Sequence, residues 1–219
     1  EAAQNLRNYY QWITDKFKPY LRGDGTEIGA GQGNYGHYLK PYFSNLDLVE
    51  PSKKQSTLLL DSFKDEPCIQ VYSDTIDTYL LKRGRQSRDC ICLVNVLEHI
   101  EDDQNALKCF HELLKTNGYL CIFVPAMPIL YSKLDNILGH YRRYVLADIN
   151  EKVTNAGFKV IEQCYMDIIG VAAWGLINTI LGFQNLNSNM TLLYDRFFVP
   201  LTRALENKVE IPIGKSLMI

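Results

Sequence analysis

Three glycines that alternate with other residues are the first feature of the sequence able to support chemistry. They are Gly29, Gly31 and Gly33, and Glu27 precedes them. Glycine adopts positive φ and carries no Cβ, so a ligand can lie directly against such a backbone. An apolar run before the glycines and a helical pattern after them predict a strand, a tight turn and a helix N-terminus. This arrangement is typical of nucleotide-type binding sites.

Two kinds of cofactor fit these glycines. The residues from Gly31 to Gly36 satisfy G-x-G-x-x-G, and Glu50 follows at about the spacing of a ribose-binding acid, as in nicotinamide-dependent dehydrogenases. Glu27 favours a different ligand, because a carboxylate at this place attracts an ammonium group and repels a pyrophosphate. A plain strand–turn–helix connection, with the glycines there for packing alone, is the structural alternative.

Acidic and polar residues follow other apolar runs in the same way. The carboxyl ends of parallel strands meet at one edge of a sheet, which is where ligands of such sheets bind. We therefore expect one site to be lined by the residues after three further runs, which are Glu50, Pro51, Asp74, Thr75, Asn95, Val96, Glu98 and His99.

The stretch from Glu27 to Gly33 resembles motif I of class I S-adenosylmethionine-dependent methyltransferases. The stretch Asn95-Val96-Leu97-Glu98-His99-Ile100 resembles the segment after the fourth strand in small-molecule members, including the ubiquinone-pathway type. The resemblance covers about residues 20–165. It implies S-adenosyl-L-methionine as the cofactor and a Rossmann-like methyltransferase fold.

The resemblance also implies roles for single residues. Glu27 would place the amino group of the cofactor, Glu50 would bind both ribose hydroxyls, and Asp74 would accept a hydrogen bond from the adenine amino group. Asn95 would lie beside the methionine part. The remaining cofactor-binding residues are expected to be Gly29, Ala30, Gly31, Gly33, Pro51, Thr75 and Val96.

A loop rich in tyrosine and arginine follows Pro125 and is predicted to hold the acceptor. It resembles a loop of bacterial methyltransferases from polysaccharide and secondary-metabolite pathways. Arginine binds carboxylate or phosphate through its fork and tyrosine stacks, which suits an anionic or sugar-like small molecule. Solvated arginines are the structural alternative. The predicted substrate-binding residues are Tyr131, Tyr141, Arg142, Arg143 and Tyr144.

Histidine is the side chain suited to act as a base near neutral pH, and two histidines are catalytic candidates. His140 lies in the acceptor loop, and His99 precedes a predicted helix. A base matters most when the nucleophile is a neutral hydroxyl, so O-methylation is favoured with His140 as base or orienting group. N-methylation stays open, because an amine attacks without prior deprotonation. A purely structural role is the alternative for each histidine.

The alternation of apolar runs with helical patterns predicts an α/β doubly wound, mostly parallel sheet, which the resemblance makes seven-stranded. We expect one domain over 1–219, with an N-terminal helix (1–20), a cofactor-binding core (21–165), a helical insertion (166–210) and a last, antiparallel strand (211–219). Without the resemblance, the last segment would be only an edge strand. Within the core, strands are predicted at 46–49, 68–72, 90–94, 120–124 and 158–165, and helices at 35–42, 52–63, 101–117 (ended by Gly118) and 146–155.

The C-terminal quarter carries two apolar segments, Ile168–Phe183 and Leu192–Leu205. The first is shorter than the ~20 residues that a membrane-spanning helix needs. A helix that covers the active site or a second copy of the chain is the first interpretation, and contact with a membrane surface or a lipid-linked acceptor is the second. The same region supports a rival function, a non-catalytic module that binds a partner or membrane.

Composition narrows the remaining classes. Among 219 residues 47% are apolar, and the net charge of −2 gives no basic surface for nucleic acid. Six cysteines lie mostly in apolar runs, without a C-x-x-C pair or a histidine at ligand spacing. They predict reduced core cysteines and no metal. With no signal peptide in the sequence, we expect a cytoplasmic protein, with peripheral attachment to a membrane as the variant.

Overall fold

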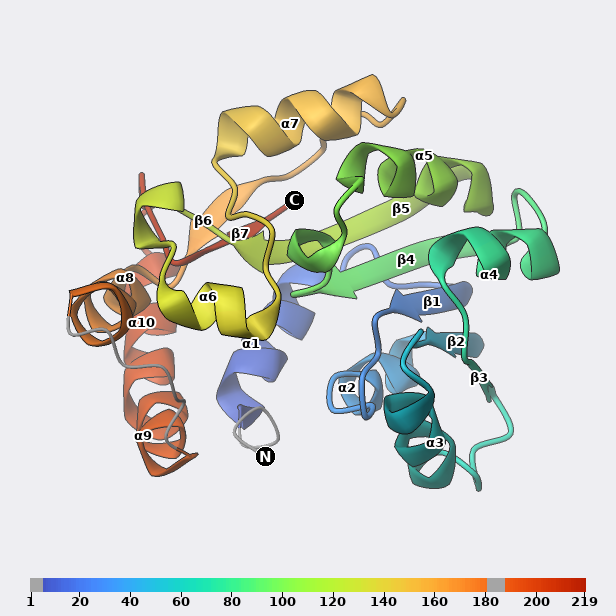
Figure 1. The fold of residues 1–219 in the computed structure, drawn as a ribbon, viewed down its shortest axis with the longest axis horizontal. Coiled ribbons are helices and arrows are strands. Elements are labelled where there is room, and N and C mark those ends of the chain that lie inside the picture. The colour runs from blue at the N-terminus through green and yellow to red at the C-terminus, as the bar shows by residue number, and fades with distance from the viewer. Residues whose placement is uncertain (1–5, 181–187) are drawn as a thin grey trace.

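The computed structural model describes residues 6–180 and 188–219, and its centre is a seven-stranded sheet with helices on both faces (Figure 1). The strand order is β3-β2-β1-β4-β5-β7-β6. β1 to β5 are parallel, and β7 runs antiparallel to both β5 and β6. The doubly wound, mostly parallel sheet is therefore confirmed. The strands are β1 (Asp24–Ile28), β2 (Asn45–Val49), β3 (Ile69–Tyr72), β4 (Arg88–Val94), β5 (Leu114–Pro125), β6 (Cys164–Met166) and β7 (Ser216–Met218).

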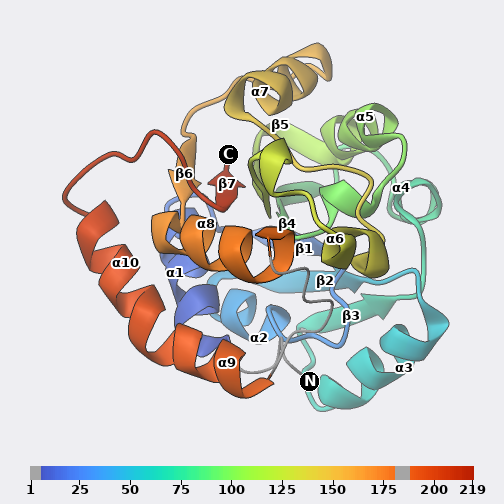
Figure 2. The same cartoon turned by 60° about the vertical axis from the view of Figure 1, so that its left-hand side comes forward.

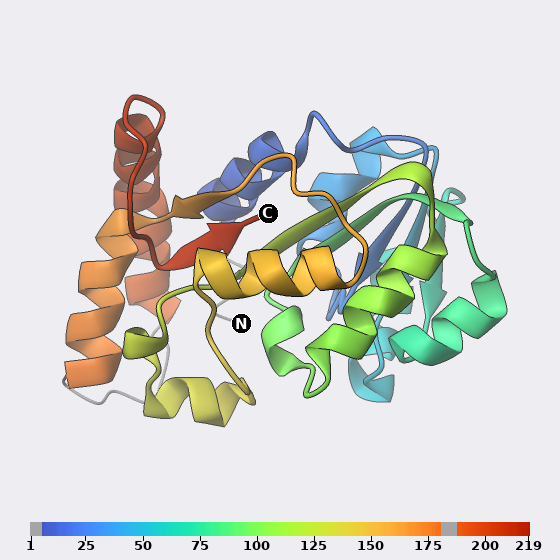
Figure 3. The ribbon, with the colours of Figure 1, turned by 90° about the horizontal axis from the view of Figure 1, so that it is seen from above.

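Two layers of helices cover the sheet, as Figure 3 shows from above. One layer is α1 (Arg7–Phe17), α2 (Gly36–Leu39) and α3 (Lys53–Ser62), and the other is α4 (Ile76–Arg83), α5 (Asp103–Leu113) and α7 (Leu146–Asn155). β4 is apolar from Cys90 to Val94 because both faces of this part are buried under these layers. The prediction of a central buried strand at 90–94 is confirmed.

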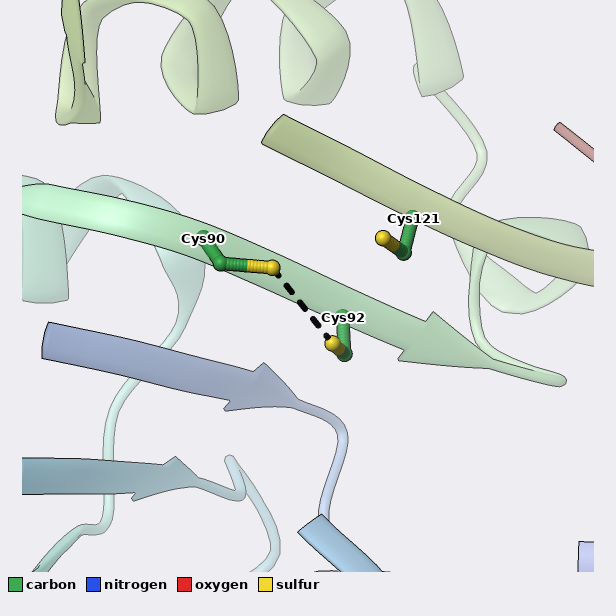
Figure 4. A group of neighbouring side chains, drawn as sticks. All are labelled: Cys90, Cys92 and Cys121. Carbon is green, nitrogen blue, oxygen red and sulfur yellow. Dashed lines mark hydrogen bonds between the residues drawn. The ribbon is translucent and has the colours of Figure 1, made fainter. Parts of the chain in front are cut away.

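The three cysteines of β4 and β5 lie together in the core (Figure 4). Cys90 and Cys92 share one face of β4, as alternate residues of a strand do, and their Sγ atoms lie 3.9 Å apart. Cys121 faces them from β5. All six cysteines are free, and burial raises the pKa of the Cys92 thiol. Cys90, Cys92 and Cys121 are buried in the core, as predicted, whereas Cys68, Cys109 and Cys164 are only partly buried.

Several predicted boundaries were wrong. Gly118 does not end the helix before it, because α5 ends at Leu113 and the chain enters β5 at once. The strand predicted at 158–165 is reduced to β6, since only its last residues pair with β7. β7 lies between β5 and β6, so it is not an edge strand. α4 and α6 (Lys133–Leu138) were not predicted, and in the described part of the N-terminal helix α1 begins only at Arg7.

Helices fill the stretch between β6 and β7 and lie beside α1 (Figure 2). They are α8 (Ile168–Trp174), a π-helix (Gly175–Ile180), α9 (Ser188–Leu193), a second π-helix (Tyr194–Phe198) and α10 (Val199–Glu206). The end of the predicted apolar segment, 181–183, lies outside the described residues. Among the residues described, no helix is long and apolar enough to cross a membrane.

Asp195 joins this C-terminal region to the start of the chain. Its carboxylate accepts hydrogen bonds from the backbone N–H groups of Asn8 and Tyr9 at 3.0 and 2.9 Å. These groups belong to the first turn of α1, where backbone donors have no partner within the helix. Because the residue before the helix provides no side-chain cap, Asp195 caps α1 from a distant part of the sequence.

Candidate active site

The loop after β1 has the backbone that its glycines predict. Gly29, Gly31 and Gly33 have φ values of 68°, 58° and 88°, in the region that side chains disfavour. A Cβ on Gly29 would lie 2.6 Å from Val96, and one on Gly33 would lie 2.4 Å from Phe63. The loop therefore depends on glycine for conformation and for close packing.

A cavity of about 310 Å³ opens where the strand order reverses, between the ends of β1 and β4. Ligands of open α/β sheets bind at this switch point. Five predicted cofactor residues line the cavity, and they are Glu27, Gly29, Ala30, Gly31 and Asn95. A larger cavity of about 870 Å³ lies at the opposite edge of the sheet, around the start of β5, away from these residues.

Among the described residues that line the smaller cavity, Glu27 is the only acidic or basic side chain. It is 3% exposed, and its Oε2 atom has no hydrogen-bond partner. Burial, with a smaller contribution from the charge of Glu50, raises the pKa of Glu27 from 4.5 to about 8. A buried carboxylate without a partner favours a cationic ligand, which would supply the missing hydrogen bond and charge.

Glu50 lies behind the glycine loop and holds it in place. One carboxylate oxygen accepts a hydrogen bond from the N–H of Gly31 and the other from the N–H of Ser52, both at 2.9 Å. Each oxygen keeps a second lone pair, so two ligand hydroxyls can still bind. Glu50 itself does not line the cavity, and the predicted ribose contact remains a prediction.

The other predicted cofactor residues contribute in different ways. Asp74 is paired with Lys82, whose Nζ lies 2.7 Å from both carboxylate oxygens, and Thr75 caps α4 by accepting from the N–H of Thr78. Val96 packs on Gly29, whereas Pro51 is exposed. These residues lie outside the cavity lining. The cavity therefore brings together the residues predicted to hold the methionine part of the cofactor, but not Asp74, which was predicted to bind the adenine.

Asn95 ends β4 with φ at 54°, which is uncommon for a residue with a side chain. Its N–H donates to the carbonyl of Phe123 at 2.8 Å, and its side chain is exposed at the cavity. Strained backbone of this kind gathers at functional sites. From here the chain enters a short 3-10 helix, Leu97–His99, which carries the next group of polar side chains.

Glu98, His99 and His140 form this second group. Nε2 of His140 lies 4.0 Å from Oε1 of Glu98, and the two imidazole rings meet edge to face with centroids 4.6 Å apart. Glu98 is 0% exposed, neither of its carboxylate oxygens has a hydrogen-bond partner, and burial raises its pKa to about 8. Burial and the neighbouring His140 lower the pKa of His99.

Asp135 orients His140 from the other side. Its Oδ1 lies 2.9 Å from Nδ1 of His140 and 2.8 Å from Nε of Arg143, while Oδ2 accepts from the N–H and hydroxyl of Ser132. Although burial opposes the shift, the hydrogen bonds from His140 and Arg143 lower the pKa of Asp135 to about 2. A permanent carboxylate here fixes Nδ1 as the protonated nitrogen and leaves the Nε2 lone pair free.

The predicted acceptor residues divide into an inner and an outer set. Arg143 is buried, with its guanidinium over the ring of Trp174. Tyr144 is also buried, and its hydroxyl lies 2.9 Å from Asp103. Burial and the charge of Asp103 raise the pKa of Tyr144 well above the usual value. The hydroxyl of Tyr131 donates to the carbonyl of His140. These three side chains hold the loop, and Tyr144 is unsuited to act as a base.

Tyr141 and Arg142 form the outer set. Tyr141 is 53% exposed, and the Arg142 guanidinium lies 5.7 Å from the centre of its ring. Arg142 also forms a salt bridge of 2.7 Å with Asp103, so it is not a freely solvated charge. None of the five predicted acceptor residues lines the 310 Å³ cavity.

Sequence reasoning missed several residues of the site. Tyr10 of α1 lines the cavity. Burial raises the pKa of Tyr10 to about 12, with a smaller contribution from the charge of Glu27. Glu98 was expected among the lining residues but received no chemical role, and Asp135 received none either. The partners of Asp135 are close in the sequence, since Ser132, His140 and Arg143 all lie within eight residues of it, whereas Glu98 meets His140 only through the fold. The other cavity residues that were not predicted include Asn34, Tyr35, Gln55 and Val94.

The fold and this site define a class I S-adenosylmethionine-dependent methyltransferase. Residues 5–163 match the family described as "Methyltransferase domain", which is well over half of the chain. The chain therefore belongs to that family, is an enzyme, and uses S-adenosyl-L-methionine. This result is against the nicotinamide-dependent and the non-catalytic alternatives. No curated protein sequence matches the chain.

Solved structures support the fold. A S-adenosylmethionine-dependent methyltransferase from Archaeoglobus fulgidus is similar over 95% of this chain and 92% of its own, with a TM-score of 0.61 and 13% identity. YcgJ from Bacillus subtilis covers 85% and 83%, with a TM-score of 0.62 and 14% identity. A possible histamine N-methyltransferase from Thermotoga maritima covers 74% and 76%, with a TM-score of 0.61 and 22% identity.

The residues at the switch point fit this cofactor. Glu27, whose Oε2 has no hydrogen-bond partner, lines a cavity that suits an ammonium group, and the glycine loop leaves the backbone open to close approach. Glu27, Gly29, Gly31 and Asn95 would hold the methionine part. When bound, the cofactor supplies a methyl group on a positively charged sulfur, and the chain's own residues have only to bind, orient and remove a proton.

Proposed function

We propose that this protein transfers the methyl group to a hydroxyl oxygen of a small molecule. The observation that carries the proposal is the Asp135–His140 pair, in which Asp135 lies 2.9 Å from Nδ1 of His140 and orients the ring so that Nε2 can accept a proton. In the reaction, the acceptor oxygen bonds to the methyl carbon, the carbon–sulfur bond breaks with its electrons left on sulfur, and the hydroxyl proton goes to His140.

Two contributions to the rate support this assignment. Orientation of two bound reactants supplies about 7–11 kcal/mol, and a general base adds about 10²–10⁴-fold. His99 lies against His140 and is exposed, so it would meet the acceptor first. An amine acceptor would need no base. The oriented and half-buried histidine is thus the reason to favour oxygen over nitrogen.

We further propose an anionic or sugar-like acceptor that meets the outer side of the loop. Tyr141 offers an exposed ring for stacking, and Arg142 offers a cation whose present partners are the carboxylate of Asp103 and the carbonyl of Glu101. Arg143 and Tyr144 would keep the loop in place from inside. A labelled-methyl assay with hydroxylated acids, phenols, nucleotide sugars and matched amines tests this. Methylation of amines alone would overturn the proposal of O-methylation.

The C-terminal helices suggest a partner for the whole enzyme. Large apolar side chains are exposed on α9, the second π-helix and α10, including Leu193, Phe197, Phe198, Leu201 and Leu205. We propose that a second copy of the chain covers them in a cytoplasmic enzyme, with peripheral contact to a membrane surface as the alternative outcome. Sedimentation of the pure protein and flotation with vesicles distinguish the two.

A further inference from the structure

We propose that Glu98, His99 and His140 bind a divalent transition-metal ion, with Zn²⁺ the best match. The three side chains offer one carboxylate oxygen and two imidazole nitrogens, and these ligand atoms lie within 4.8 Å of one another. Imidazole and carboxylate are a common ligand set for Zn²⁺ and for other divalent first-row metals. This proposal of metal binding does not depend on which acceptor is methylated.

The spacing of the ligand atoms is close to that of a bound site. Zinc lies about 2.0–2.2 Å from nitrogen and oxygen ligands, so tetrahedral ligands lie roughly 3.4 Å apart. Nε2 of His140 and Oε1 of Glu98 are 4.0 Å apart, so this pair must approach by about half an ångström. His99 is exposed, and its ring already lies against that of His140, with a ligand nitrogen within 4.8 Å of the other two ligand atoms.

Glu98 gives independent support, because it is fully buried and has no partner for either carboxylate oxygen. Arg143, whose charge acts on Glu98, already donates to Asp135 and to the carbonyl of Ala126. A buried carboxylate without hydrogen bonds is costly unless a cation neutralises it. A metal ion between Glu98 and the two histidines would provide that cation.

The surroundings of His140 are those of a metal ligand. Histidines that bind metal donate their other N–H to a carboxylate or carbonyl, which fixes the ring and its tautomer. Asp135 accepts from Nδ1 of His140 at 2.9 Å and is itself held by Ser132. Three protein ligands with an exposed side leave a coordination position open, as in catalytic rather than structural zinc sites.

The expectation of no metal rested on the cysteines. Cys90, Cys92 and Cys121 also lie within ligand distance of one another, but all three are buried in the apolar core. The proposed site was invisible to spacing rules because His140 follows Glu98 and His99 only after α5, β5 and α6.

A metal ion would change the role of His140 in the reaction. It would occupy Nε2, and it would itself lower the pKa of an acceptor hydroxyl that filled the open position. This part of the inference rests on the proposed function. Chelation separates the two mechanisms, since a direct base keeps working without metal and a metal site does not.

The test is titration of chelator-treated protein with Co²⁺, followed by its visible absorption, and then displacement by Zn²⁺. We expect one equivalent to bind without the near-ultraviolet band of thiolate ligands. Glu98→Gln and His99→Ala should each weaken binding by at least about 100-fold, and Asp135→Asn by about 10–100-fold. His111→Ala is the matched control, because it removes a histidine from α5 that meets Phe158 edge to face, and it should bind as the wild type does.

Zn²⁺ should also raise the melting temperature of the wild type and of His111→Ala but not of Glu98→Gln. Because glutamine nearly matches glutamate in shape and removes a buried charge, this variant is expected to fold. Absence of Co²⁺ binding, binding that survives Glu98→Gln and His99→Ala, or a thiolate band would overturn the proposal. Failure to bind S-adenosylhomocysteine would instead count against the cofactor site, and methylation confined to amines would count against the proposed function alone.

Discussion

Glu27 and Glu98 are both buried acids that lack a hydrogen-bond partner, but their neighbours differ. Burial raises the pKa of each to about 8, and each has a carboxylate oxygen without a partner. Glu27 faces a cavity beside backbone glycines, with only Glu50 as a charged neighbour, whereas Glu98 faces two imidazoles. The first surroundings suit an organic ammonium and the second suit a metal ion. What a buried acid binds is set by the groups that face it.

The largest expected effect is on catalysis and concerns the surroundings of Glu98. His140→Ala removes the nitrogen that faces Glu98, so kcat should fall about 10²–10⁴-fold, and the affinity for S-adenosylhomocysteine should not change. Methylation rates and calorimetric titration measure the two effects. His111→Ala should leave both as in the wild type. Wild-type kcat in His140→Ala would show that the acceptor needs no group at this place.

Cofactor binding should show the reverse pattern. Glu27→Gln should weaken S-adenosylhomocysteine binding by about 1.5–3 kcal/mol, the range for a hydrogen bond to a charged group. An analogue without the amino group should bind the variant and the wild type equally well. Glu98→Gln is the matched control and should leave this affinity unchanged. Equal losses in the two variants would mean that the acids do not serve separate ligands.

The protonation of Glu27 gives a smaller, pH-dependent effect. Between pH 4.5 and about 8 the folded protein holds the Glu27 proton more tightly than the unfolded chain does. The free energy of unfolding should therefore fall as pH rises through this range, by up to about 1.4 kcal/mol per pH unit from this residue. Denaturation curves of the wild type and Glu27→Gln across this pH range isolate the contribution of Glu27, because the variant lacks this pH dependence of the free energy of unfolding. Parallel curves would place the pKa of Glu27 near its usual value.

Cofactor binding below pH 8 should also release up to one proton, because an ammonium ligand favours the ionised acid. Calorimetry in two buffers of different ionisation enthalpy detects this proton. The release should disappear in Glu27→Gln and persist in Glu98→Gln.

The exposed apolar helices should affect neither acid. Phe197 is 58% exposed, so Phe197→Ser should change the free energy of unfolding by no more than about 0.5 kcal/mol. It should lower self-association if a second copy covers the helix, or vesicle binding if lipid does. Trp174 is a poorer probe, because its indole N–H donates to Leu130 and Arg143 lies over its ring. A change in cofactor affinity in Phe197→Ser would link this surface to the site.

Sequence patterns predicted the parts of the fold that depend on residues close together in the sequence. The apolar run at 90–94 and the glycine loop depend on neighbouring residues, and the structure confirms both. α4 was missed although Thr75 caps it, and α6 was missed although Ser132 and Asp135 form a capping box. Both helices are short, so their apolar periodicity is weak.

The pairing of polar side chains was harder to predict. Arg143 was assigned to the acceptor, yet it turns inward to Asp135 and Trp174. Glu98 gives no local sign that it lacks a partner, because the groups around it come from after α5, β5 and α6. Motif spacing indicates which residues gather at a strand end, but burial and hydrogen bonding decide which of them remain available to a ligand.

The distant cap on α1 has a consequence for how the protein is made. Asn8 and Asp195 are separated by 187 positions, and a ribosome adds about 5–20 residues per second. The N-terminal donors of α1 therefore wait roughly 10–40 s for their acceptor to be synthesised. Tyr10 of the same helix lines the cofactor cavity. The helix that provides this wall of the cavity therefore receives its cap only after Asp195 has been synthesised.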